Sequence, residues 1–121
     1  MTKLVASQLV PVISRGARIV RDVMREVIQD QLEPSEPFQP PASPSGRYER
    51  SWRAGRAIVF DDAVVASAFT EARAANGENL GDMLEHGTEK MAPRPHRDQA
   101  IERARPAIES LVRESEQQLG E

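Results

Sequence analysis

The chain has 121 residues, a length that suits one domain with a single hydrophobic core. It contains no cysteine, which excludes a disulfide scaffold, thiolate catalysis and every zinc site that needs sulfur, and which fits folding in a reducing cytoplasm. The net charge of −3 hides an asymmetry, because residues 1–60 carry nine Lys and Arg against six Asp and Glu, whereas residues 61–121 carry seven against thirteen. This asymmetry fits head-to-tail contacts between copies, a basic face turned toward nucleic acid, or two ordinary solvated surfaces.

The first long segment, residues 14–31, is predicted to form an amphipathic helix. Pro11 disfavours helix at Val10 and removes an amide donor, so residues 1–13 are expected to form an N-terminal arm or a separate short helix. Apolar residues recur at steps of three and four on one side of the long helix, while charged residues occupy its other faces. The apolar series is Val12 or Ile13, Ala17, Val20, Val23 with Met24, and Val27 with Ile28.

Residues 33–46 contain five prolines and no periodicity, so we expect an extended loop there. A proline-rich ligand for a recognition domain is the alternative interpretation. It predicts that deleting residues 36–44 abolishes partner binding without altering assembly.

Two antiparallel strands are predicted next, at residues 48–60 and 63–72, because both segments are rich in β-branched and aromatic residues around the Asp61-Asp62 turn. Gly55 is expected to mark a bulge or bend in the first strand. In the second strand Val65, Ser67 and Phe69 alternate with three other residues, although its alanine content leaves a helix open as an alternative. Those three residues are Val64, Ala66 and Ala68.

The rest of the chain is predicted to be mainly helical. Residues 76–79 have turn composition, and residues 80–85 form a short helix that Gly87 ends. Residues 95–118 form a C-terminal helix with Pro95 in its first turn and with a kink or break near Arg105, because Pro106 lies inside the pattern. The predicted fold class is therefore α+β, with a long N-terminal helix, a small antiparallel sheet and a C-terminal helix packed on the sheet.

No residue constellation typical of catalysis is found. His86 and His96 lack the spacing and the companion ligands of a metal site. No serine lies in a nucleophile elbow, no glycine-rich nucleotide loop is present, and the Asp61-Asp62 pair is expected to point apart into solvent. We therefore expect a protein that is not an enzyme and that has no cofactor and no metal.

Composition also bears on location and assembly. No apolar run approaches the roughly 20 residues of a membrane span, and the N-terminus lacks the pattern of a signal peptide, so we expect a soluble protein that is not exported. Hydrophobic residues make up 39% of the chain and aromatic residues only 4%, and much of the apolar content is alanine. Such a core is thin, which suggests that partner subunits complete the burial.

One basic stretch could bind a charged partner. Four arginines recur every third residue with Tyr48 and Trp52 between them, a pattern suited to phosphate contact and base stacking. A strand at this spacing would send alternate arginines to opposite faces, and the arginines could instead pair with the acidic half of a neighbouring copy while Trp52 fills the core. The four residues are Arg47, Arg50, Arg53 and Arg56.

The segment "LEHGTEKMAPRPHRDQAIERARP", residues 84–106, resembles the signature of the neck or tail-completion proteins of tailed bacteriophages, a head-tail joining family. The family pattern runs aromatic or aliphatic residue, Glu, aromatic, Gly-Thr, then Met-Pro-x-Arg-Pro-Phe before the C-terminal helix. "SGRYERSW", residues 45–52, is similar to the start of the family's first strand, and the resemblance covers roughly residues 14–115. The matching positions are Leu84, Glu85, Gly87, Thr88, Met91, Arg94 and Pro95.

Some positions depart from this family pattern. His86 and His96 stand at aromatic positions, Ala92-Pro93 inverts the usual order after the methionine, and Ser45 stands for threonine. The proline-rich loop is also longer than the family's linker. The Ala- and Arg-rich composition would suit a phage, a prophage or a gene transfer agent of a high-GC host.

The resemblance implies a structural virion protein of the neck, made in the bacterial cytoplasm, that joins the DNA-filled head to the tail. It implies a homo-oligomeric ring of about six or twelve copies, with a portal adaptor or stopper on one side, a tail terminator on the other and genomic DNA in the lumen. Pro93 and Pro95 would fix the backbone around Arg94, so that a rigid loop keys one subunit to the next; a plain strand-to-helix connector is the alternative. The implied interface residues are Glu85, Gly87, Thr88, Met91, Pro93, Arg94 and Pro95.

Overall fold

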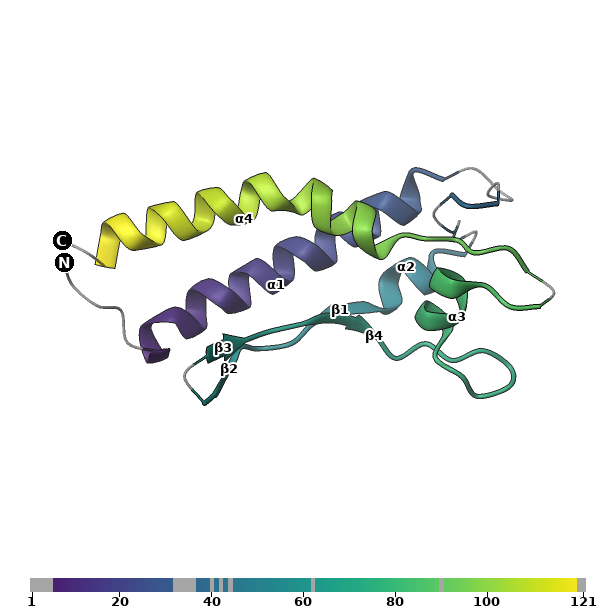
Figure 1. The fold of residues 1–121 in the computed structure, drawn as a ribbon, viewed down its shortest axis with the longest axis horizontal. Helices are drawn as coiled ribbons and strands as arrows, with labels where there is room; N and C mark the ends of the chain where they lie inside the picture. Colours follow the sequence, from purple (N-terminus) through teal and green to yellow (C-terminus); the bar gives the residue numbers. More distant parts are fainter. Residues whose placement is uncertain are drawn as a thin grey trace.

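The structure is a computed structural model that describes residues 6–31, 37–39, 41, 43, 45–61, 63–89 and 91–119. Its α+β class, with two antiparallel strand pairs between long terminal helices, confirms the predicted fold. Helix α1 lies between α4 and the strands, and α3 lies at the end of the molecule opposite the β2–β3 turn (Figure 1). The elements in chain order are α1 (Ala6–Gln29), α2 (Arg47–Ser51), β1 (Trp52–Ala54), β2 (Ile58–Phe60), β3 (Ala63–Val65), β4 (Ala68–Thr70), α3 (Leu80–His86) and α4 (Arg97–Leu119).

Helix α1 begins at Ala6, eight residues before the predicted start, so the expected separate arm or short helix is wrong for residues 6–13; residues 1–5 lie outside the described residues. Pro11 is tolerated because it lies near the helix start, where it breaks only one backbone hydrogen bond, to the carbonyl four residues earlier. The predicted apolar stripe is confirmed. Its most buried members are Ala17, Met24, Val27 and Ile28, and the polar Ser14 is buried beside them.

Helix α2 occupies residues for which the sequence predicts a strand. Gly46, with a φ of 73°, turns the chain into the helix, and the Ser45 and Ser43 hydroxyl oxygens accept hydrogen bonds from the first-turn amides of Arg47 and Glu49, each at 3.2 Å. The predicted start of the first strand at Tyr48 is therefore wrong, and β1 begins at Trp52. The described parts of the proline-rich loop contain turns and no helix or strand, as predicted, while residues 33–36, 40, 42 and 44 lie outside the described residues.

The strands form one antiparallel hairpin in two sections. Ala54 lies opposite Ala68, and Ile58 lies opposite Val65, so three residues on one strand face two on the other. This is the bulge predicted at Gly55, whose amide donates to the Ser67 carbonyl at 2.9 Å. From residue 63 to residue 70 every second residue is more buried, which confirms the predicted alternation and excludes a helix there.

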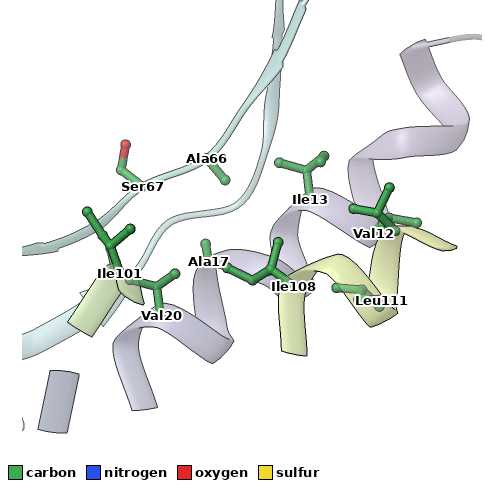
Figure 2. Close-up of a pocket in the computed structure, with 12 residues that line it drawn as sticks. Val12, Ile13, Ala17, Val20, Ala66, Ser67, Ile101, Ile108 and Leu111 are labelled. Atoms are coloured by element: carbon green, nitrogen blue, oxygen red, sulfur yellow. The ribbon is translucent and has the colours of Figure 1, made fainter. Parts of the chain in front are cut away.

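Helix α4 begins at Arg97, so Pro95 precedes the helix instead of lying in its first turn. The sequence predicts a kink or a break near Arg105. The helix continues through Pro106, so there is no break. Pro106 is exposed, and water can therefore hydrogen-bond the Glu102 carbonyl that loses its amide partner. Helix α4 packs on α1, and it also faces the sheet, as predicted, across a groove lined by both helices and by residues 66–68 (Figure 2).

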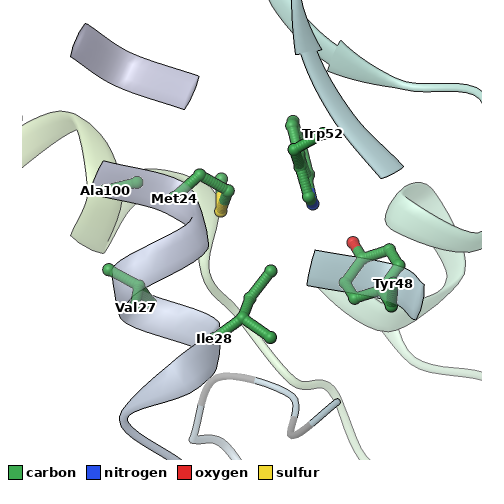
Figure 3. Close-up of a cluster of buried hydrophobic side chains, with 6 residues drawn as sticks. All are labelled: Met24, Val27, Ile28, Tyr48, Trp52 and Ala100. Atoms are coloured by element: carbon green, nitrogen blue, oxygen red, sulfur yellow. The ribbon is translucent and has the colours of Figure 1, made fainter. Parts of the chain in front are cut away.

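The main core cluster lies where α1 meets α2, β1 and the start of α4. Met24 and Ile28 point from α1 toward Trp52 and Tyr48, and Ala100 closes the cluster from α4 (Figure 3). Trp52 is 3% exposed, as the core-filling interpretation predicts. The cluster is small, so much apolar surface elsewhere is left in contact with water.

Candidate functional site

The motif segment forms the joint between α3 and α4. Asn79 caps the start of α3: its side-chain oxygen accepts from the Asp82 amide at 3.1 Å, and its side-chain nitrogen donates to the Thr70 carbonyl at 2.9 Å. The helix ends at Gly87, whose amide donates to the Met83 carbonyl at 2.8 Å. One residue therefore anchors α3 to β4 at its start, and a glycine ends it.

Gly87 is required for two independent reasons. Its φ of 76° and ψ of 179° lie in a region that only glycine occupies freely. A Cβ at this position would lie 2.8 Å from both the Met91 carbonyl oxygen and the Pro93 nitrogen. The tight turn that follows is closed by paired backbone hydrogen bonds between Thr88 and Met91, at 2.9 and 3.2 Å.

The chain then returns along α3 and contacts the proline-rich loop. The Arg94 amide donates to the Leu84 carbonyl at 2.6 Å, and the Pro93 carbonyl accepts from the Phe38 amide at 2.9 Å. Pro93 and Pro95 restrict the backbone torsions on either side of Arg94. Two segments far apart in the sequence are thus joined through the backbone.

Glu85 connects the two helices directly. Its carboxylate accepts two hydrogen bonds, from the His96 amide at 3.0 Å and from the Arg97 amide at 2.8 Å. These amides lie at the start of α4, where backbone N–H groups have no partner within the helix and where the helix dipole favours a negative charge. Glu85 therefore caps α4 from α3, and its side chain is only 13% exposed.

His96 fills the space between this cap and the aromatic core. Its ring is fully buried, its Nδ1 lies 2.8 Å from the Arg94 carbonyl oxygen, and its Nε2 lies 2.7 Å from the Tyr48 hydroxyl. A carbonyl can only accept, so Nδ1 carries the proton and Nε2 accepts from Tyr48. Burial lowers the pKa of His96 below its ordinary 6.5 and raises the pKa of Tyr48, so both groups are neutral at pH 7.

The structure brings the predicted interface residues together in this joint. Thr88 is exposed, while Met91, Pro93 and Pro95 are partly buried. Arg94 is also partly buried, and its Nη1 is enclosed without a hydrogen-bond partner in the described part of the chain. Sequence reasoning identified Glu85 and Gly87 without their partners. In the family pattern His96 stands at an aromatic position. This position is the one feature of the sequence that indicates a buried ring beside the aromatic core.

The four arginines do not form one strand. Arg47 and Arg50 lie on α2, Arg53 on β1 and Arg56 in the bulge. All four are exposed, and none forms an ion pair with another described residue. Base stacking would require exposed rings, whereas the aromatic residues of this stretch are buried, Tyr48 at 8% and Trp52 at 3% exposure; phosphate contact by the arginines stays a prediction.

Other candidate chemistry is not assembled within the described residues. No three His, Asp or Glu side chains gather there in a way that could hold a metal ion. Asp61 is exposed with a φ of 53°, and Asp62 lies outside the described residues. None of the described helices combines the length and the apolar character that crossing a membrane requires.

Buried His96 makes the stability of the fold depend on pH. Above about pH 6.5 neither state protonates this ring, whereas below that pH the unfolded chain gains a proton that the folded chain resists. We expect the free energy of unfolding to fall by up to about 1.4 kcal/mol per pH unit as the pH drops from 6.5 toward the lowered folded pKa. Urea unfolding at pH 5, 6 and 7, followed by Trp52 fluorescence, measures this slope.

His96→Phe removes the titrating ring and should show a smaller slope in this window. Tyr48→Phe keeps His96 buried and serves as the control, with a slope like that of the unchanged chain. Equal slopes in the unchanged chain and in His96→Phe would contradict the assignment.

Comparison with known proteins finds no match to this chain among protein-family models, curated proteins or solved structures. Any functional conclusion therefore depends on the motif and on the geometry of the site. In that geometry the backbone after Gly87 is held by hydrogen bonds, and His96 and Tyr48 are buried and neutral. Such an arrangement stabilises a rigid structure.

Proposed function

We propose that this chain is a structural subunit of the neck of a tailed phage or phage-like particle, joining the DNA-filled head to the tail through ring assembly. The observation that carries the proposal is the joint itself. The motif residues shared with the neck family, Glu85, Gly87 and Arg94, all take part in its hydrogen bonds or its tight turn.

A rigid joint is useful in a ring because each subunit must contact the next at one fixed angle. A heterologous interface closes only if the rotation between copies is constant, and otherwise it produces filaments. Three sets of hydrogen bonds fix the relative positions of three surface elements: Glu85 accepts from amides at the start of α4, Arg94 donates to α3, and Phe38 donates to Pro93. The joint thus supports the constant geometry that closure needs.

The exposed apolar surface also supports assembly. Ile58 and Phe60, which lie two residues apart on β2, are each more than 60% exposed in a chain whose described core contains two aromatic side chains. A clustered apolar surface on a small protein commonly marks a protein contact. In the proposed particle these contacts would be other copies, the portal adaptor or stopper, and the tail terminator, with genomic DNA in the lumen.

The test is whether the purified protein forms rings or enters particles. Light scattering at several concentrations measures its mass, and cosedimentation with particles that lack only this protein measures its incorporation. We expect rings, or monomers that enter the particles, and we expect Arg94→Ala to reduce incorporation at least about tenfold. Arg113→Ala, an exposed arginine on α4 far from the joint, is the matched control.

A protein that stays monomeric and does not cosediment with the particles would contradict the neck proposal. If that monomer shifts labelled DNA at low salt, and if Arg50→Ala with Arg53→Ala abolishes the shift, the chain is a small nucleic-acid-binding protein instead. The observation that favours this second function is the exposure of four arginines that form no ion pair with a described residue.

A further inference from the structure

The bulge at Gly55 decides which face of the hairpin carries its large apolar side chains. If residues 55–57 paired one to one with the other strand, with no bulge, Ile58 and Phe60 would share the inner face of Trp52 and Ala54, toward α1. With the bulge, they lie opposite Val65 and Ala63 on the outer face. The bulge therefore turns two large apolar side chains toward solvent.

The result is an exposed apolar strip on the outer face of the hairpin. Ile58 is 61% exposed, Phe60 67% and Val65 47%, and Phe69 continues the strip on β4 at 36%. Single exposed apolar residues are common, but a contiguous strip near the tip of a hairpin is typical of a contact surface. We name these four residues the hairpin strip.

The groove between α1 and α4 is apolar, like the hairpin strip. Eleven of its twelve lining residues are apolar or glycine, none is charged, and its volume is about 390 Å³. An apolar cavity of about 150 Å³ can hold a benzene ring, so this groove has room for the side chains of a phenylalanine and an isoleucine. Val20, Ile108 and Leu111 line it, and Ile101, 49% exposed, stands at its rim (Figure 2).

The hairpin strip cannot fill the groove of its own chain. Ala66 and Ala68 line that groove from the inner side of the ribbon, whereas the hairpin strip lies on the opposite side. The groove of a second copy has no such restriction. Charge also fits, because Asp61 in the hairpin turn is exposed and acidic, while exposed Arg105 lies one helical turn from both Ile101 and Ile108.

We propose that the hairpin of one copy docks in the α1–α4 groove of the next, with Phe60 and Ile58 inserted and Asp61 near Arg105. The contact joins two different surfaces, so it repeats from copy to copy and builds a ring or a chain. The inference rests on the proposed ring assembly for its biological setting. The contact itself is tested in purified full-length protein, independently of any particle.

Two variants each remove one side of the contact. Phe60→Ser disables the hairpin strip and leaves the groove intact, whereas Ile101→Glu places a charge at the groove rim and leaves the hairpin intact. Phe60 is 67% exposed and Ile101 49%, so neither belongs to the buried core and both variants should fold, which the near-ultraviolet signal of Trp52 checks. Each variant is expected to raise the Kd of self-association at least about tenfold. The measurement covers protein concentrations from about 10 µM to 1 mM.

Mixing the two variants tests the pairing of surfaces. A chain with only a groove and a chain with only a hairpin can still make one contact, so an equimolar mixture should give a dimer that neither variant forms alone. Isotope-labelled Phe60→Ser should then show chemical-shift changes at Gly16, Ser67 and Ile108 when unlabelled Ile101→Glu is added. Phe38→Ser is the matched control, since Phe38 is 65% exposed but lies outside the hairpin, and it should associate like the unchanged chain.

Several results would overturn the inference. Failure of the mixture to dimerise while the unchanged chain assembles would leave ring assembly standing and would assign it to another surface. Shift changes confined to residues 58–65 of both partners would indicate a symmetric hairpin-to-hairpin contact instead. If the unchanged chain stays monomeric up to about 1 mM, hairpin docking is wrong. The neck proposal would be contradicted only if the chain also failed to enter the particles.

Discussion

Replacing Gly87 with alanine is expected to lower the free energy of unfolding by about 3 to 5 kcal/mol. The backbone at Gly87 has φ of 76° and ψ of 179°, which costs a residue with a Cβ about 1 to 3 kcal/mol. The new methyl group would also lie 2.8 Å from two backbone atoms, which cannot move as a flexible side chain can. Small domains are stable by only about 5 to 15 kcal/mol, so chemical denaturation should show a large shift in midpoint.

Gly77→Ala separates the two causes. Gly77 has a φ of 87°, yet a Cβ there would meet no atom within 4 Å, so only the conformational cost of about 1 to 2 kcal/mol applies. The difference between the two variants measures the close approach of Met91 and Pro93 to Gly87. Equal losses in Gly77→Ala and Gly87→Ala would show that the turn opens to accept the methyl group and that the joint is not rigid.

The parts of the fold that the sequence predicts well are those set by local periodicity. The apolar stripe of α1 and the alternation from Val64 to Thr70 reflect one face turned toward a core, and the burial of these residues follows the pattern. Gly55 signals the bulge because glycine is poorly suited to the interior of a regular strand. Local rules could not show that the bulge moves Ile58 and Phe60 to the outer face, since this depends on the pairing of β2 with β3.

The errors arise where a distant or neighbouring group overrides local preference. Residues 47–51 contain strand-favouring Tyr48, but the turn at Gly46 and the hydroxyl caps of Ser43 and Ser45 start a helix instead. The site shows the same limit. The hydrogen bonds of Glu85 to the start of α4, and of His96 to Tyr48, span 11 to 48 residues and leave no periodic signal in the sequence.

The joint and the groove are connected through the start of α4. Ile101 lies four residues after Arg97, whose amide Glu85 caps, so the carboxylate helps to set where the first groove residue of α4 stands relative to α1. A change in the joint should therefore act on assembly as well as on stability. This link predicts that variants of the joint weaken self-association even though they do not touch the groove.

Replacing Glu85 with alanine is expected to lower the free energy of unfolding by about 2 to 4 kcal/mol, because two charge-assisted hydrogen bonds to backbone amides are lost at a largely buried position. The His96 and Arg97 amides would be left without the carboxylate, and the favourable interaction with the helix dipole would be lost as well. Urea unfolding at pH 7 measures the change, and hydrogen exchange at the first amides of α4 locates it. The same variant should raise the Kd of self-association, because it loosens the placement of Ile101.

Glu85→Gln keeps one acceptor oxygen without the charge and should lose roughly half as much stability, about 1 to 2 kcal/mol. Glu109→Ala, an exposed glutamate in the middle of α4, should change stability by less than about 0.5 kcal/mol and leave association unchanged. If Glu85→Ala behaved like Glu109→Ala in both measurements, the carboxylate would not hold α4, and the orientation of the groove would have to depend on the packing of α4 against α1 alone. If stability fell while association stayed constant, the joint would serve the fold, and its link to assembly would be wrong.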